Sequence, residues 1–216
     1  EDGIRARSPS RGLGDVYKRQ DIKARLVIKG FLDPQLNQIV TAAATASALS
    51  HRMLASYAVN HGMRVISYDI SSAFLQGLLL KDLEKRGENK RLVFFDPPAD
   101  AWDLLYEIMP DKCAILETVK APRYSDEVTL EANKGVYGLG DAPRLWRQRF
   151  HDWMISQKFV QSKFDECMYF KKELSGGKLC KLVVTTHVDD CELCGTPETL
   201  KSFHKSPLVV LLIKYA

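Results

Sequence analysis

Apolar and polar positions alternate in several short runs, which predict strands. Residues 22–30 alternate cationic and apolar side chains and end in a glycine, so we expect a half-exposed strand there. Residues 63–70 are β-rich and lead into a short helical or turning segment, and residues 91–98 form another strand-like run that ends at two prolines. Three more strands in succession are predicted by the segments "ECMYFKKE", "KLCKLVVTTHV" and "CELCG".

Two longer segments repeat their apolar positions at helical spacing instead. Alanines and leucines do so over residues 43–60, and a His-Gly pair supplies the stop. Residues 141–159 place Asp141 at the expected cap and Pro143 in the first turn, followed by one apolar stripe. Helices therefore interrupt a mainly antiparallel sheet, which predicts an α+β fold.

Composition narrows the class of protein. The chain has 216 residues, of which 45% are hydrophobic and 27% charged, so it can bury a core. The apolar run over residues 207–216 is too short to span a bilayer, and the first residues lack the apolar core of a secretion signal. We therefore expect an intracellular protein with no membrane partner. Its five cysteines then fit reduced thiols, and its formal net charge of +4 permits a polyanionic partner without requiring one.

The N-terminal segment differs from the rest of the chain. Residues 1–20 are rich in Arg, Gly and Ser and show no apolar period. We therefore interpret them as a tail, a linker or an artefactual segment, with a basic RNA-binding arm as the alternative.

Three carboxylates are the strongest candidates for chemistry. Asp189 and Asp190 follow an apolar strand at a predicted hairpin turn, where acids are often merely solvated. Asp69 ends another apolar strand and is followed by small residues. Carboxylates that converge in this way repel one another unless cations neutralise them, and hard oxygen ligands select magnesium or manganese. Two such ions can support an in-line phosphoryl displacement.

A zinc site is a weaker interpretation of the same region. His187, Cys191 and Cys194 give an H-x3-C-x2-C spacing without a clear fourth ligand. In a regular strand the two cysteines lie on opposite faces, which disfavours shared coordination.

Several motifs together resemble a known family. The segments "KARLVIKGF", "YDISSAFLQG", "RLVFFDPPAD", "VYGLGDAPRLW" and "GKLCKLVVTTHVDD" occur in this order. They are similar to the reverse transcriptase of Ty1/copia-type retrotransposon polyproteins, and the resemblance covers residues 22–196. It implies the fingers and palm of a right-hand polymerase, with Asp69 as the acid of the first polymerase motif. Asp189 and Asp190 then match the acids of the hairpin motif.

The resemblance also implies roles in nucleotide binding, each with a plainer alternative. Phe74 matches the bulky residue that excludes a 2′-hydroxyl, and its alternative is an ordinary core aromatic. Lys23 and Arg25 resemble the cations that meet the incoming triphosphate, or they belong to a solvated strand face. Tyr137 and Arg144 match a motif beside the nucleotide and template, although helix capping and packing also explain that stretch.

The chain departs from the family pattern at a few positions. His187 stands where Tyr is usual, and Gly140 and Asp141 replace Lys-Gln, so an acid is gained near the expected phosphates. We expect residues 21–200 to form the fingers and palm. Residues 201–216 would be a truncated remnant, which leaves no room for a thumb or a ribonuclease H domain.

The function implied is RNA-directed DNA polymerization with Mg²⁺, or Mn²⁺, as the cofactor. The partners implied are an RNA/DNA primer-template, deoxynucleoside triphosphates and the remainder of the polyprotein, namely integrase and ribonuclease H. The expected location is cytoplasmic, in virus-like particles, or nuclear. Two alternatives stay open: a DNA-templated polymerase or other two-metal nucleotidyltransferase, and a catalytically inactive relic that folds and binds nucleic acid.

Overall fold

The structure, a computed structural model, describes most of the chain. The described residues are 26–96, 101, 103, 107–108, 110–111, 129–175, 178–204 and 213–215. They form helices and an antiparallel sheet, which confirms the α+β prediction at that level. In this part of the chain, no helix is long and apolar enough to cross a membrane.

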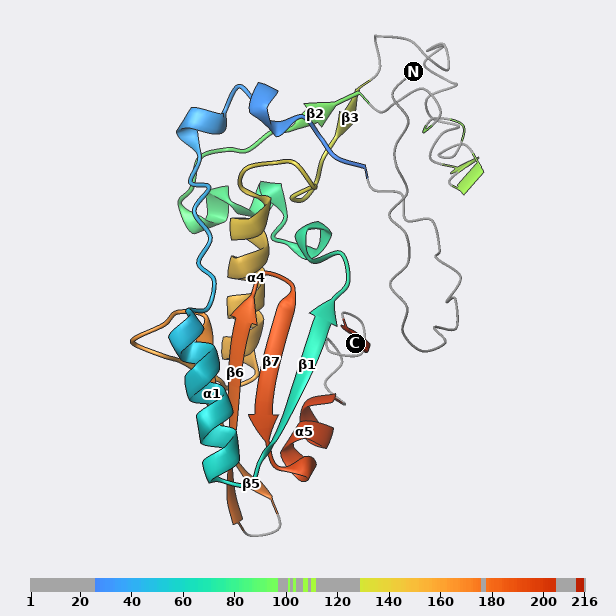
Figure 1. Cartoon of the computed structure of the whole chain (residues 1–216). Helices are drawn as coiled ribbons and strands as arrows, with labels where there is room; N and C mark the ends of the chain where they lie inside the picture. The colour runs from blue at the N-terminus through green and yellow to red at the C-terminus, as the bar shows by residue number, and fades with distance from the viewer. Residues whose placement is uncertain are drawn as a thin grey trace, which may run out of the picture.

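The larger sheet has six strands in the order β4-β5-β6-β7-β1-β8, all paired antiparallel. Figure 1 shows β6, β7 and β1 side by side in this sheet. Its members are β1 (Arg64–Ile70), β4 (Val160–Gln161), β5 (Met168–Ser175), β6 (Lys178–His187), β7 (Asp190–Gly195) and β8 (Ile213–Tyr215). β1 and the β5-β6-β7 succession agree with the strands that the alternating pattern predicts. The spatial neighbours β1 and β7 are far apart in sequence, and their pairing positions the candidate site.

Helices cover both faces of this sheet. α1 (Ala48–Asn60) packs Leu54 and Ala58 against Val183 of β6 and Cys194 of β7. On the other face, α4 (Ala142–Ser156) and α5 (Pro197–His204) pack on the alternate residues of the same strands. The residues of this second layer include Tyr68, Trp146, Phe150, Leu193, Leu200 and Phe203. α5 spans residue 200 and supplies Leu200 and Phe203 to this core.

A second cluster joins the start of α4 to a smaller unit. That unit contains the two-stranded sheet of β2 (Phe94–Phe95) and β3 (Leu130–Glu131). It also contains the short 3-10 helices η1 (Gly30–Leu32), η2 (Leu36–Gln38), η3 (Ala73–Gln76), η4 (Leu80–Asp82) and η5 (Glu84–Arg86). The buried residues of this cluster are Leu78, Leu80, Leu83, Val93, Ala132, Leu139, Ala142 and Leu145.

The strand expected over residues 22–30 is wrong within the described residues. Residues 26–29 have no regular structure, and η1 begins at Gly30. The backbone here passes close to the backbone at Tyr137 and Gly138. The Ile28 N–H donates to the Tyr137 carbonyl, and a Cβ on Gly30 would clash with the Gly138 carbonyl oxygen. The segment therefore packs backbone against backbone and does not enter a sheet.

Two other boundaries differ from the expected ones. The helix expected from residue 43 begins at Ala48, because the Ser47 hydroxyl caps it by accepting from the Ser50 N–H, while Ala46 N–H bonds to the Thr186 carbonyl. Within the described residues 91–96, the strand expected over residues 91–98 covers only Phe94–Phe95, and the Leu92 N–H donates to the Gln35 side chain instead of to a neighbouring strand.

Candidate functional site

The three predicted acids gather where β1 ends and β7 begins. In the β1-β7 ladder Asp69 lies directly opposite Asp190, and Ile70 N–H donates to the Asp189 carbonyl at 3.0 Å. Residues paired in an antiparallel ladder have Cα atoms about 4.5–5.5 Å apart and point to the same face of the sheet. All three acids are exposed. The β1-β7 register therefore brings these three positions together in the backbone, and their sharing of a cation stays a prediction.

The turn that carries Asp189 is strained and anchored. Val188 has φ of 57°, a left-handed conformation that β-branched residues rarely adopt. Trp146 of α4 holds this residue, because its indole N–H donates to the Val188 carbonyl at 2.8 Å. Backbone strain of this kind persists only where surrounding contacts enforce it, and it gathers at functional sites. The helix thus fixes the turn between the strands that bear the acids.

Sequence reasoning missed two polar residues on the same face. Glu192 lies two positions after Asp190 and accepts a 2.8 Å contact from the His51 ring Nδ1, which is also 3.3 Å from the Thr185 hydroxyl. The donor and acceptor roles depend on the histidine tautomer. The period of two along β7 could have placed Glu192 beside Asp190, but nothing local indicates that α1 brings His51 there.

The donor chemistry of the acid group suits a divalent cation. Carboxylate oxygens are the ligands preferred by Mg²⁺ and Mn²⁺. In the described part of the chain, no three His, Cys, Asp or Glu side chains are grouped so that they could hold a metal ion. The fit therefore rests on the residue types and on the ladder that sets Asp69 against Asp190.

Cys191 and Cys194 do not lie where both could bind one metal ion. Cys191 packs in the core layer beneath α4 and α5, whereas Cys194 packs under α1, so the predicted placement on opposite faces is confirmed. Burial raises the pKa of the Cys191 thiol, and the negative charges of Asp190 and Asp189 raise it further. Burial likewise raises the pKa of Cys194, to about 11. Both side chains are accordingly neutral core residues at pH 7.

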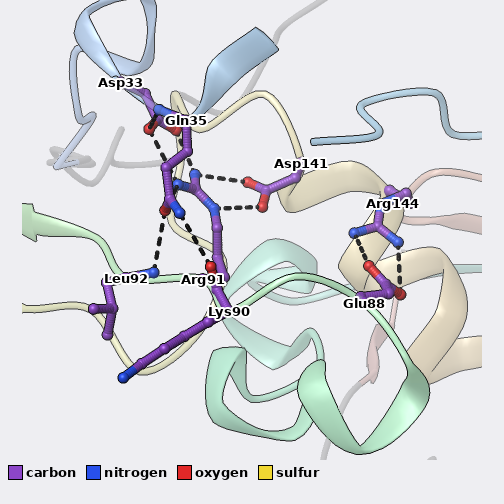
Figure 2. A network of polar contacts seen from close by, with 8 residues as sticks. All are labelled: Asp33, Gln35, Glu88, Lys90, Arg91, Leu92, Asp141 and Arg144. Carbon is purple, nitrogen blue, oxygen red and sulfur yellow. Dashed lines mark hydrogen bonds and ion pairs between the residues drawn. The ribbon is translucent and has the colours of Figure 1, made fainter. Parts of the chain in front are cut away.

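The predicted nucleotide-binding residues have different surroundings. Phe74 in η3 and Tyr137 lie together, with ring centroids 5.3 Å apart, and Phe74 is half-buried between the two main core clusters. Arg144 is mostly buried, and its terminal nitrogens donate to the two Glu88 oxygens at 3.1 and 2.7 Å (Figure 2). Lys23 and Arg25 lie outside the described residues.

Comparison with known proteins finds similarity to parts of transposon polyproteins. Over 181 residues, 82% of the chain, it is 26% identical to the retrovirus-related Pol polyprotein from transposon TNT 1-94 of Nicotiana tabacum. It is 27% and 26% identical, over 179 residues each, to the corresponding polyproteins from transposons RE1 and RE2 of Arabidopsis thaliana. The chain is a relative of copia-type retrotransposon Pol polyproteins. It spans 10–11% of the length of these polyproteins. No family model and no solved structure matches it.

Asp141, where this Pol relative departs from the copia-type motif, is buried and paired. It stands at the N-cap position of α4, but its side chain caps nothing, contrary to the sequence expectation. Its carboxylate instead accepts from Arg91 Nε at 2.9 Å, and the other side of the same guanidinium is bound to Asp33 (Figure 2). The side chains of Asp141 and Arg91 are 0% and 1% exposed. The acid gained at this position therefore does not face solvent.

His187, the other departure, lies at the edge of the acid group. It is exposed and pairs opposite Asp190 in the β6-β7 ladder. A histidine at this place keeps a polar ring on the face that carries Asp69 and Asp190.

Proposed function

We propose that this chain is an RNA-directed DNA polymerase domain of a copia-type Pol polyprotein, with the fingers and palm of a right-hand polymerase. The observation that carries the proposal is the register of β1 and β7, which sets Asp69 opposite Asp190 beside the turn residue Asp189. The relationship to retrotransposon Pol polyproteins supports it.

In this proposal the three acids and the residues that position them have separate roles in phosphoryl transfer. Asp69, Asp189 and Asp190 would hold two divalent cations, which supply activation of the attacking hydroxyl and stabilisation of the leaving oxygen. The Val188 turn and the Trp146 hydrogen bond keep the acids of the hairpin in place.

Other residues would bind the nucleotide and the primer-template. The adjacent rings of Phe74 and Tyr137 form one aromatic surface. We propose that this surface contacts the deoxyribose of the incoming nucleotide and the neighbouring part of the template. Lys23 and Arg25 are proposed to meet the triphosphate, since a lysine and an arginine match phosphate oxygens by charge and hydrogen bonding. Arg144 already donates to Glu88, so we propose that its contribution is to hold the motif at the start of α4.

The buried position of Asp141 supports activity despite its change from the family motif. An exposed acid beside bound phosphates would repel them. Arg91 binds this carboxylate within the protein, and the Asp141 side chain is 0% exposed, so it does not face solvent.

Primer extension with magnesium tests the proposal. We expect the purified chain to extend an oligo(dT) primer on poly(rA), and to do so better than on poly(dA). Asp69→Asn and Asp190→Asn should each lower extension by at least about a hundredfold, because several kcal/mol of metal-dependent stabilisation is lost. Glu84→Gln, which removes an exposed carboxylate in η5, is the matched control and should retain activity.

Three outcomes would contradict the proposal in distinct ways. Asn variants that extend primers normally would remove the acids from the chemistry. Equal or better use of poly(dA) would indicate a DNA-templated polymerase. A folded chain that binds primer-template without extending it would be the inactive relic.

A further inference from the structure

A pocket opens between α1 and the β5-β6 pair, away from the acid group. Its volume is about 480 Å³, which is in the range of sites for small organic ligands. Lys181, which lines the pocket, precedes His187 by six positions on β6, so this lysine lies roughly 20 Å along the strand from the acids at about 3.3 Å per residue. Its lining is chiefly apolar and includes Met53, Tyr57, Met168, Phe170 and Val183.

The charged residues of this pocket are cationic. Lys172 of β5 and Lys181 of β6 are directly opposite each other in the ladder, and both line the pocket. Like charges in directly opposite positions destabilise a sheet. No carboxylate is among the described residues of the lining. An anion between the two ammonium groups would relieve their repulsion.

Tyr57 adds a hydrogen-bonding group without a partner. Its hydroxyl oxygen is buried and has no hydrogen-bond partner among the described residues. The Nζ atom of Lys181 lies 5.9 Å from the centre of the same ring. Because this hydroxyl is closed off from solvent, an anionic oxygen beside the ammonium can reach it only if the lining side chains move as a ligand enters.

The surroundings of the Tyr57 ring argue against a stacked nucleobase. The ring lies 4.0 Å, centroid to centroid, from the tilted ring of His61, and Lys181 lies over it. A base would have to displace one of these neighbours to stack. The thioethers of Met53 and Met168 instead provide an adaptable apolar surface, which suits a flexible chain.

We propose that this pocket binds a small amphipathic acid, with its apolar chain along the methionines and Phe170. Its carboxylate lies at Lys172 and Lys181 and accepts a hydrogen bond from Tyr57. The proposal rests on the pocket itself and not on polymerase activity, so either can fail without the other.

Calorimetric titration of the full chain with decanoate, below its micelle concentration, tests this site. We expect one decanoate per chain and an affinity at least about tenfold above that for decanol, since a charge-assisted contact is lost with the alcohol. The Lys172→Gln/Lys181→Gln variant should lose at least about tenfold in affinity for decanoate and little for decanol. Lys201→Gln, an exposed change on α5, is the matched control and should bind as the parent does.

Tyr57→Phe separates binding from folding. Because the hydroxyl is buried without a partner, its removal should leave the melting temperature of the ligand-free protein unchanged or slightly higher, while decanoate binds more weakly. Equal affinities for decanoate and decanol, or an equal loss in Lys201→Gln, would overturn the proposal. Displacement of decanoate by single-stranded DNA in the parent, but not in the lysine variant, would also overturn it and assign the pocket to nucleic acid.

Discussion

At the scale of single residues, the pairing of Asp69 with Asp190 lowers the free energy of unfolding. They are exposed, directly opposite each other, and of like charge. Such a cross-strand pair typically destabilises a sheet by about 0.2–1 kcal/mol. In the proposed function, a cation between the carboxylates would offset this repulsion, so the same two residues would link stability to metal.

Asp190→Asn should therefore stabilise the protein in metal-free buffer, by a few tenths to about 1 kcal/mol, because it removes the like-charge pair. Magnesium should raise the melting temperature of the parent and have a smaller effect on the variant. Urea unfolding with a chelator and with magnesium measures both effects. A variant that is less stable than the parent without metal would show that the carboxylate makes a structural contact instead.

The sequence could predict these acids because each ends a strongly apolar strand. The resemblance of their motifs joined segments 120 positions apart. Arg144 and Asp141 were harder to interpret because their environments come from distant segments. Glu88 and Arg91, which bind them, lie 56 and 50 positions away, in a stretch with no regular period.

At the scale of elements, the period of the apolar positions predicted the helices and strands that bury one face. α4 has a clear apolar stripe, and the β5-β6-β7 succession alternates, so both were found with small boundary errors. The segment around Gly30 was predicted wrongly because its contact is with the Gly138 backbone. Side-chain alternation carries no information about that kind of packing.

The smaller unit depends on one buried cation. Arg91 joins Asp33, which follows η1, to Asp141 at the start of α4, and these three side chains are 1%, 7% and 0% exposed (Figure 2). Gln35 also contacts this guanidinium and accepts from Leu92 N–H. One side chain thus holds three separate segments together.

Arg91→Ala should destabilise the protein by about 3–5 kcal/mol, since it leaves two buried carboxylates without their partner. Arg86→Ala, which removes the exposed pair with Asp152, is the control and should cost about 0–1 kcal/mol. Urea denaturation compares the two. Adding Asp141→Asn to Arg91→Ala should recover part of the loss, and strict additivity of the two changes would contradict a coupled network.

At the scale of the whole molecule, helices pack on both faces of the sheet that carries the acids. Trp146 shows the connection, because it belongs to the core layer and also binds the Val188 carbonyl. Phe74 packs against the two largest clusters and follows β1, the strand that carries Asp69. The positions of the site residues therefore depend on how the larger sheet packs against the smaller unit.

Several carboxylates accept hydrogen bonds from other segments of the chain, and these donors lower their pKa values. Hydrogen bonds from Arg144 lower the pKa of Glu88 despite its partial burial. Burial alone would raise the pKa of Asp33 and Asp165, but hydrogen bonds outweigh it. Arg91 and the Gln35 N–H lower the pKa of Asp33. For Asp165 the donors are the Ser50 hydroxyl and the N–H groups of residues 47 and 167, which connect the start of α1 to the loop before β5.

These shifts predict acid sensitivity. A carboxyl group whose folded pKa is lowered binds fewer protons in the folded state, so its stabilisation is complete above the unfolded pKa of about 4. That stabilisation is lost as the pH falls through the lower, folded value. The urea midpoint should therefore stay nearly constant from pH 7 to 5 with respect to these groups and fall steeply below about pH 4. Glu88→Gln should lower the midpoint at pH 7 and flatten the fall below pH 4, whereas Glu84→Gln should do neither. A urea midpoint that is the same at pH 3.5 and pH 6 would show that these carboxylates do not stabilise the folded protein.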